Sequence, residues 1–309
     1  MRDSERLFID GGALKTPRYL DVELTNCCNF QCCFCPTGTK SMNRMRGYMQ
    51  PEVVEAICDN VKKYDVPGVR FIRWGEPTLH PEYIEILKKM KSTGTLIHIN
   101  TNGSLMTANQ MRALIDMGLD SIKFSFQGAD EGTYNEMRQG GEYSKLLGII
   151  REFNQIRGDR DFPFIQISTT LTSETDDQIE NFKHDVEGLC DYYNIGYTQL
   201  DHLSVKDMNV NDEQKQKIEK LQARERKNHI RSMVCPEAFD KLSINWNGDV
   251  TLCCSDYDNF MTIGNILDND LQQLFTSKAA EQYRRVIAAG EYDKIRCCKY
   301  CYDLIPLNR

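Results

Sequence analysis

Residues 19–36, YLDVELTNCCNFQCCFCP, join a short run of alternating polar and apolar residues to a loop with five cysteines. The run Tyr19–Leu24 has the alternation of a β-strand. In the loop, Cys28, Cys32 and Cys35 follow the spacing Cys-x3-Cys-x2-Cys. A cysteine loop directly after a strand predicts a site at the carboxyl edge of a sheet, where α/β proteins collect their ligands.

The pattern of this first strand recurs from Tyr19 to about Thr198. Short β-branched runs alternate with longer amphipathic runs, which is typical of repeated βα units. Pro51 and Thr107 mark helix starts, and Gly118 follows a helix end. Because six units are too few for a closed eight-stranded barrel, we predict an α/β fold with an open, partial (β/α)6 parallel barrel. The strands are expected at Tyr19–Leu24, Val69–Arg73, Leu96–Asn100, Ser121–Phe126, Phe164–Leu171 and Asn194–Leu200.

The composition changes after residue 204. Residues 205–232 are polar and charge-dense, with one helical run from about Asp212. Farther on, Asn247-Gly248 indicates a β-hairpin, and cysteines are frequent near the end of the sequence. We therefore expect a barrel over residues 1–204, a helical connector over 205–232, and a small cysteine-rich domain of a hairpin plus a helix over 233–309.

Overall composition excludes several classes of protein. The net charge is -7 and the basic residues form no stripe, so a nucleic-acid partner is not expected. No stretch approaches the roughly 18 apolar residues of a membrane span, and the N-terminus lacks an export signal, so we expect a cytoplasmic protein without membrane contact. In such a protein an odd count of 13 cysteines indicates metal binding or redox chemistry more than disulfides.

The first cysteine loop fits an iron–sulfur cluster. The thiolates of Cys28, Cys32 and Cys35 can bind three irons of a 4Fe-4S cubane, and no fourth ligand is close in the sequence, so one iron remains open to a small chelating molecule. A structural zinc site is the alternative, although zinc usually takes a fourth ligand. Cys27 and Cys33 fall out of this register and are interpreted as loop or core thiols, with a ligand role left open.

Further polar residues follow the next strands and are expected at the same edge. After the second strand, the backbone at Gly75 can approach a ligand closely, and the Glu76 carboxylate or a neighbouring carbonyl, next to Pro77, can accept a hydrogen bond from an ammonium group. Asn102 follows the third strand, where it either faces the site or stabilises its own turn. Ser125 and Gln127 end the fourth strand.

A second set of cysteines lies in the last part of the sequence. Cys235 and Cys253 flank the predicted hairpin, and Cys298-x2-Cys301 follows a helix that can fold back. Four thiolates would make a fully ligated 4Fe-4S cluster, and a structural zinc site is the rival. The doublets Cys253/Cys254 and Cys297/Cys298 leave the register of the ligands open.

On these motifs the chain resembles the radical SAM superfamily, whose signature is this cysteine spacing with an aromatic residue, here Phe34, before the third cysteine. Gly75-Glu76-Pro77 resembles the Gly-Gly-Glu element of the family, with Trp74 in place of the first glycine. The resemblance implies that the amine and carboxylate of S-adenosylmethionine bind the open iron. It also implies that Ser125 contacts the ribose or carboxylate, and that Arg138 pairs with the carboxylate.

The later cysteines resemble the Twitch domain, the shortened form of the SPASM extension, through Gly248-x4-Cys253 and Cys298-x2-Cys301. A full SPASM domain needs seven cysteines, so one auxiliary 4Fe-4S cluster is expected. In size and cysteine layout the chain is similar to the compact Twitch enzymes of aminoglycoside biosynthesis, which include 2-deoxy-scyllo-inosamine dehydrogenase and neomycin epimerase.

The resemblance implies reductive cleavage of S-adenosylmethionine to a 5'-deoxyadenosyl radical, with an external electron donor such as flavodoxin or ferredoxin. We expect hydrogen abstraction from a carbinol carbon of a sugar or aminocyclitol, leading to epimerisation or oxidation. Cys254, beside the auxiliary cluster, is the candidate hydrogen-atom donor for epimerisation, with a packed thiol as the alternative. Radical modification of a peptide and a non-catalytic electron-transfer or sensor role are the competing functions.

Overall fold

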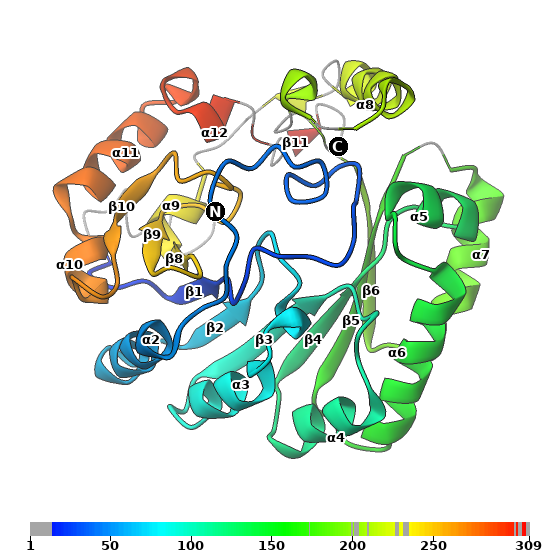
Figure 1. The fold of residues 1–309 in the computed structure, drawn as a ribbon, viewed down its shortest axis with the longest axis horizontal. Helices are drawn as coiled ribbons and strands as arrows, with labels where there is room; N and C mark the ends of the chain where they lie inside the picture. Colours follow the sequence, from blue (N-terminus) through cyan, green and yellow to red (C-terminus); the bar gives the residue numbers. More distant parts are fainter. Residues whose placement is uncertain are drawn as a thin grey trace.

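The structure is a computed structural model that describes residues 14–172, 174–198, 200, 204–208, 210–225, 229–230, 235–299, 301 and 305–306. Its centre is a run of six parallel strands, each paired with the next in chain order (Figure 1). This confirms the predicted open α/β sheet, and the boundaries agree within a few residues. The strands are β1 (Tyr19–Val22), β2 (Gly68–Phe71), β3 (Leu96–Thr101), β4 (Ser121–Ser125), β5 (Phe164–Leu171) and β6 (Tyr192–Tyr197).

Helices cover the outer face of this sheet (Figure 1). The first begins with Pro51 at its first turn, and Thr107 forms a capping box at the start of another, as the sequence indicates. Gly118 follows a helix end with φ of 75°, a backbone conformation that favours glycine. The helices are α2 (Pro51–Lys63), α3 (Tyr83–Lys91), α4 (Ala108–Asp116), α5 (Glu131–Met137), α6 (Tyr143–Arg157) and α7 (Asp176–Val186).

The two faces of the strands differ in polarity because successive side chains point to opposite sides. In β3, Ile97 and Ile99 are fully buried on the helix side, whereas His98 and Asn100 point inward. In β4, Phe124 packs against Phe153 of α6 while Lys123 points inward. The apolar core therefore lies between sheet and helices, and the concave side of the barrel is polar.

The C-terminal strands join the same sheet. β8 (Lys241–Ile244) pairs in parallel with β1, and β9 (Asp249–Thr251) and β10 (Thr262–Asn265) continue it antiparallel, giving nine strands. The predicted hairpin at Asn247-Gly248 is the β8–β9 connection. Figure 1 shows these strands in yellow and orange beside β1, so the cysteine-rich part extends the barrel.

The remaining elements are the helix of the connector, the helices of the C-terminal part and several short segments. The predicted helix in the connector is α8 (Asp212–Glu225), and the C-terminal part adds α9 (Glu237–Asp240), α10 (Leu271–Phe275), α11 (Lys278–Ala288) and α12 (Arg296–Lys299). Short turns are η1 (Pro77–Leu79), η2 (Val205–Asp207) and η3 (Tyr292–Lys294), and β7 (His229–Ile230) pairs with β11 (Ile305–Pro306).

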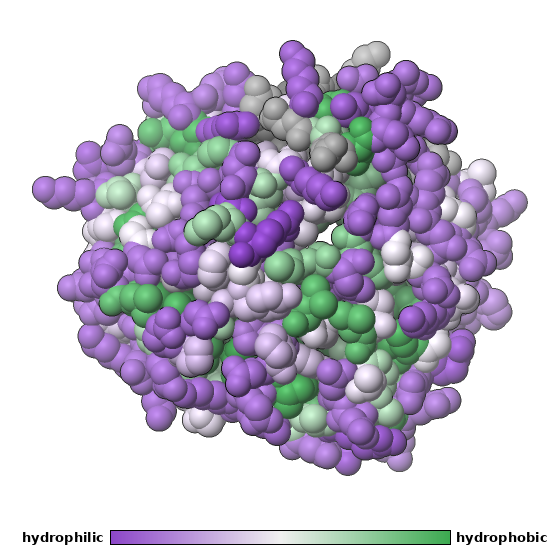
Figure 2. Space-filling model, viewed as in Figure 1, coloured by the Kyte–Doolittle hydropathy of each residue, from purple (hydrophilic) through white to green (hydrophobic). Residues whose placement is uncertain are grey.

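The surface visible in Figure 2 is mostly hydrophilic, with hydrophobic residues in small groups. In the described part of the chain, each helix is too short or too polar to cross a bilayer.

Candidate functional site

The cysteine loop follows β1 and is held against α5 by backbone hydrogen bonds. Gln31 N donates to Gln139 O at 2.8 Å, and Cys33 N donates to Met137 O at 3.1 Å. The Cys33 thiol is buried and lies 3.4 Å from the Met137 sulfur. This thiol packs against α5 and is absent from the cavity lining, whereas Cys32 and Cys35 belong to that lining.

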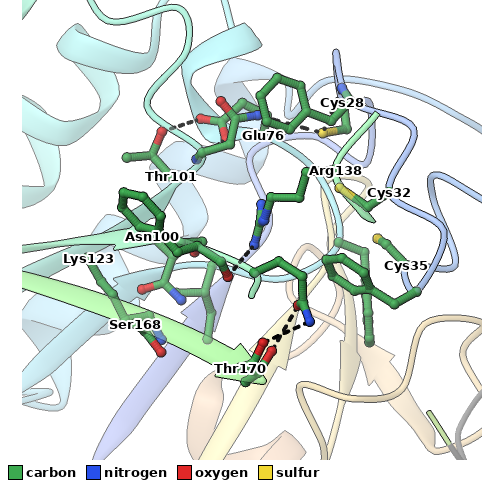
Figure 3. Close-up of a pocket in the computed structure, with 18 of the residues that line it drawn as sticks. Cys28, Cys32, Cys35, Glu76, Asn100, Thr101, Lys123, Arg138, Ser168 and Thr170 are labelled. Carbon is green, nitrogen blue, oxygen red and sulfur yellow. Dashed lines mark hydrogen bonds between the residues drawn. The ribbon is translucent and has the colours of Figure 1, made fainter. Parts of the chain in front are cut away.

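Cys28, Cys32 and Cys35 line a cavity of about 420 Å³ at the carboxyl edge of the strands. Figure 3 shows their three sulfur atoms on the same side of it, with the Arg138 side chain in the centre. Burial raises the pKa of the Cys28 thiol to about 12. In the described residues, no three His, Cys, Asp or Glu side chains converge as around a single metal ion.

The cavity also gathers most of the other residues expected at the site. Of the residues expected at the site, Pro77 alone is absent from the lining; it is buried at the start of η1. The expected residues in the lining are Phe34, Gly75, Glu76, Asn102, Ser125, Gln127 and Arg138.

Glu76 ties the ends of two neighbouring strands together. Its Oε1 accepts hydrogen bonds from Thr78 Oγ1 and Thr101 Oγ1, each at 2.7 Å, and its Oε2 accepts from Asn102 N at 2.7 Å. Burial raises its pKa, and these hydrogen bonds act in the opposite direction. Most of the hydrogen-bonding capacity of this carboxylate is therefore used by groups of the protein. An ammonium group in the cavity could still donate to Oε2 or to nearby backbone carbonyls.

Asn102 has both of the roles weighed from the sequence. Its Oδ1 accepts from Ser104 N at 2.9 Å, which closes its own turn. Its Nδ2 donates to Asn29 Oδ1 at 3.0 Å and lies 4.0 Å from Cys28 Sγ. The side chain thus stabilises the end of β3 and holds the cysteine loop against it.

Gly75 packs against the backbone of the cysteine loop. A Cβ at this position would lie 1.9 Å from Thr25 O and 2.9 Å from Cys27 O. The adjacent Glu76 N donates to Cys27 O at 2.8 Å. The requirement for glycine therefore comes from close contact between two backbone segments of this chain.

We expect Gly75→Ala to destabilise the fold by about 1–3 kcal/mol or more, because neither backbone segment can move freely away from the new methyl group. Gly148→Ala is the matched control, since its Cβ meets nothing within 4 Å on α6 and alanine favours a helix. Urea unfolding of both variants measures the difference. Equal stability of the two variants would contradict the packing argument.

Arg138 follows α5 and reaches into the cavity. Its guanidinium lies 5.5 Å from the Phe34 ring centre and donates through Nη2 to Phe126 O at 3.3 Å. Its Nε is buried and has no hydrogen-bond partner among the residues that the structure describes. A buried donor without a partner is costly, so this position suits a carboxylate that accepts from it.

Gln127 is held firmly at the end of β4. Its Nε2 donates to Thr170 O at 3.0 Å, and its Oε1 accepts from Thr170 Oγ1 at 2.8 Å. The amide is therefore engaged with β5, and its contribution to the cavity is mainly shape. Ser125, one inward position closer to the strand centre, lines the cavity beside Ser168 of the neighbouring strand.

The sequence analysis did not find the inward-pointing residues of the strand centres. Asn100, Lys123, Ser168 and Thr170 line the cavity opposite the cysteines (Figure 3). For Asn100 and Lys123 the available signal was the strand period, since they lie two residues before Asn102 and Ser125. No residue of β5 was expected at the edge, so Ser168 and Thr170 had no such reference position.

A buried charge cluster connects the two cysteine-rich regions. Arg44 follows the first cysteine loop in the sequence. Its Nη1 and Nη2 each donate to one carboxylate oxygen of Glu23 at 2.8 Å, and its Nε donates to Tyr257 O at 2.7 Å. Arg73, at the end of β2, donates to Asp256 O at 2.6 Å and to Cys253 O at 3.3 Å. Burial alone would raise the pKa of Glu23, but Arg44, Arg73 and a backbone hydrogen bond with Trp246 together outweigh it and lower that pKa.

The structure brings cysteines of the hairpin region and of α12 together. Burial and the neighbouring Cys298, Asp256 and Cys253 all raise the pKa of Cys297, with its hydrogen bond to Cys298 as the largest cause. Cys301 is buried after α12, and its N donates to Cys298 O at 3.3 Å. Cys235 is half-buried just before α9.

Cys254 does not face the cavity. Its sulfur is 3.6 Å from Glu237 Oε2 and 3.9 Å from Lys241 Nζ, and it is absent from the cavity lining. Lys241 pairs in register with Tyr19, at the amino end of β1, which is the edge opposite the cysteine loop. Cys254 also affects the pKa of Lys123, which lines the cavity, so the thiol lies near the cavity without lining it.

Comparison with known families decides the class. Residues 22–186 match the Radical SAM superfamily, which is more than half of the chain. The chain belongs to the Radical SAM superfamily. Residues 235–302 match SPASM, described as an iron–sulfur cluster-binding domain. The superfamily match and the SPASM/Twitch match imply S-adenosylmethionine and 4Fe-4S clusters as cofactors, and the three thiols beside the unpartnered Arg138 Nε fit that pair.

Individual relatives and structures agree with this class. The cofactor-modifying protein of the tungsten-containing aldehyde ferredoxin oxidoreductase from Pyrococcus furiosus is 30% identical over 52% of this chain and 46% of its own length. The chain spans about half the length of the curated relatives it matches.

Among solved structures, BtrN in complex with AdoMet and 2-DOIA has a TM-score of 0.59 at 14% identity, covering 94% of this chain and 93% of that one. Streptococcus suis SuiB bound to the precursor peptide SuiA has a TM-score of 0.67 at 15% identity, covering 97% and 74%. At these identities the likeness concerns the fold.

Proposed function

We propose that Cys28, Cys32 and Cys35 hold the cluster that binds S-adenosylmethionine, and that Arg138 binds the carboxylate of this cofactor. The observation that carries this assignment is the unpartnered Arg138 Nε in a cavity lined by the three thiols. When bound and reduced, the cofactor pair supplies a 5'-deoxyadenosyl radical that removes a hydrogen atom from a substrate. Phe34 and Gly75 shape the cavity, Glu76 and Asn102 hold the strand ends, and Ser125 and Gln127 complete its wall.

For the second site we propose that Cys235, Cys253, Cys298 and Cys301 bind one auxiliary 4Fe-4S cluster. Cys253 is close enough to Cys297 of α12 to raise its pKa, and this proximity supports a shared site for the hairpin and the C-terminal pair. We also propose that the chain divides into the barrel over residues 1–204, the connector over 205–232 and the auxiliary-cluster domain over 233–309. Thiolate-bound clusters suit a reducing compartment, so we propose a cytoplasmic enzyme that receives electrons from a flavodoxin or ferredoxin.

We further propose that the substrate is carbohydrate-like and is oxidised or epimerised at a carbinol carbon. Hydroxyl, amide and ammonium groups line the strand side of the cavity, which suits a molecule with many hydroxyls. The BtrN complex, which holds 2-DOIA in a chain of matching extent, supports a small substrate. The SuiB complex with its precursor peptide makes a peptide substrate the second candidate.

Between the two reactions, the position of Cys254 favours oxidation. Inversion at carbon requires a hydrogen-atom donor on the face opposite abstraction, and the Cys254 thiol is engaged with Glu237 and Lys241 outside the cavity lining. Turnover in deuterium oxide distinguishes the outcomes. A ketone supports oxidation, whereas an inverted product with one solvent deuterium that is lost in Cys254→Ala restores the donor role.

The experiment that tests the function uses anaerobically reconstituted protein with S-adenosylmethionine and a reductant. Mass spectrometry follows 5'-deoxyadenosine and the products from a panel of sugars, aminocyclitols and short peptides. Formation of 5'-deoxyadenosine with conversion of a sugar or aminocyclitol supports the proposal. Conversion of a peptide alone favours the second candidate, and an absence of cleavage would favour a non-catalytic role.

Arg138→Gln should weaken binding of S-adenosylmethionine about tenfold or more, because a charge-assisted hydrogen bond to its carboxylate is lost. Arg151→Gln, at an exposed position of α6, is the matched control and should bind normally. Equilibrium dialysis of the reconstituted proteins measures both. Equal affinities in the two variants would remove Arg138 from the cofactor site.

A further inference from the structure

Lys123 occupies the strand side of the cavity, opposite the cysteines (Figure 3). It lies in the middle of β4 and points to the concave side of the sheet. Its partner in register on β3 is Asn100, and the next inward position of β4, Ser125, is paired with Ser168 of β5. Paired and diagonal side chains on one face lie within reach of each other, so Asn100, Lys123, Ser125 and Ser168 form one polar surface in which Ser168 is a diagonal neighbour of Lys123.

The ammonium group of Lys123 has no hydrogen bond or ion pair within the part of the chain that the structure describes. Burial lowers its pKa, and the nearby charge of Arg70 adds to that effect, while Cys254 and Asp21 act in the opposite direction. A cation that is partly desolvated and lacks a direct partner is unfavourable unless a ligand compensates it.

The other charges around Lys123 are already paired. Asp21 Oδ1 accepts from Arg70 at 2.6 Å, and its Oδ2 lies 3.4 Å from Lys241 Nζ. Lys241 also pairs with Glu237. None of these carboxylates is therefore free to turn towards Lys123 without losing a partner of its own.

Asn100 is oriented to add a donor to this surface. Its Oδ1 is 2.6 Å from His98 Nε2, and His98 Nδ1 is 2.7 Å from Ser121 Oγ. Burial lowers the pKa of His98 to about 4, so the ring is neutral at pH 7. In the assigned amide orientation, the Nε2 proton is donated to Asn100 Oδ1, which leaves Asn100 Nδ2 as the donor available to a ligand.

We propose that Lys123, Asn100 and Ser168 form a subsite for an acidic group of the substrate, so that the substrate is an acidic carbohydrate carrying a phosphate or a carboxylate. The inference rests on the proposed function in one respect, the placement of substrate in this cavity. An ammonium, an amide N–H and a hydroxyl on one surface are donors that an anion accepts from. Arg138, which reaches the cavity from the end of α5, remains for the carboxylate of S-adenosylmethionine.

The test measures binding next to the cluster and does not depend on turnover. The probes are glucose 1-phosphate, glucuronate carrying 13C in its carboxyl group, and glucose carrying 13C at C6. In reconstituted, reduced protein, the paramagnetic cluster enhances the nuclear relaxation of a probe that binds in the cavity. Titrations with Lys123→Met, Lys123→Arg and Lys145→Met complete the set, because Lys145 is exposed on α6 and serves as the matched control.

We expect at least one acidic probe to bind the wild-type protein, with about tenfold or more weaker binding in Lys123→Met and near-normal binding in Lys123→Arg and Lys145→Met. Preference for glucose 1-phosphate or for glucuronate identifies the acidic group. Equal binding of glucose and the acidic probes, an unchanged Lys123→Met, or no binding of any acidic probe would overturn the proposal.

A separate assay keeps this inference distinct from the proposed function. Formation of 5'-deoxyadenosine is measured in the wild-type protein. The circular-dichroism spectrum and the iron content of Lys123→Met, equal to those of the wild type, show that the variant folds and carries its clusters. If the wild-type protein binds the acidic probe but never cleaves S-adenosylmethionine, the proposed reaction fails while the subsite stands.

Discussion

Protein in which Cys28, Cys32 and Cys35 are all replaced by alanine will contain about four irons per chain, compared with about eight in the reconstituted wild type. The same variant will form no 5'-deoxyadenosine. The three thiols line one side of the cavity. Neighbouring polar side chains hydrogen-bond to each other, as Asn102 does to Asn29, so they would not replace the thiols as ligands of iron. Iron and sulfide analysis and chromatography of the reaction mixture measure the two effects.

The matched control is Cys33→Ala. This thiol belongs to the same loop, but it packs against the Met137 sulfur and is absent from the cavity lining. It should retain its full iron content and the wild-type rate of cleavage. Retained cleavage in the triple variant, or loss of half of the iron in Cys33→Ala, would refute the proposed ligand register.

Replacing Cys298 and Cys301 by alanine should remove the auxiliary cluster and reduce substrate turnover to background, while the first cluster stays visible in the electron paramagnetic resonance spectrum. We hypothesise that the auxiliary cluster accepts an electron from the substrate radical or orders the substrate pocket. Cleavage of S-adenosylmethionine without substrate should persist, because Cys28, Cys32 and Cys35 lie on a separate loop.

The control for this pair is the double variant Cys58→Ala and Cys190→Ala, which removes the same number of sulfurs. The sulfur of Cys58, in α2, lies 4.0 Å from the Met90 sulfur. The thiol of Cys190, after α7, donates a hydrogen bond to Val186 O, so neither cysteine lies at a proposed cluster. It should keep both clusters. Stoichiometric zinc, in place of iron, bound by the C-terminal cysteines would contradict the assignment.

The sequence by itself determined the class of this protein. Strand period and helix caps are local signals, because they depend on residues up to four positions apart, and they predicted the six parallel strands and the starts of α2 and α4. The spacing of Cys28, Cys32 and Cys35 is also local, so it indicated the first cysteine site before any long-range contact was known. The alternation of strands and helices then predicted that the strands are parallel.

Only the tertiary structure decided how distant segments meet. β8 pairs with β1 across a separation of 222 positions, as between Tyr19 and Lys241, and no local sequence pattern predicts this pairing. The packing of Gly75 against Thr25 and the links of Arg44 and Arg73 to the second cysteine region are contacts of the same kind.

The inner surface of the barrel is the clearest example of this difference. Lys123 reads in the sequence as one polar residue of an alternating strand, with no sign of what surrounds it. Asn100 is its register partner on β3 and Ser168 is its diagonal neighbour on β5, because strand register places three separate strands side by side. Strand period fixes which residues of a strand share a face, but only the folded sheet showed that this face lines the cavity and which residues of different strands share its surface.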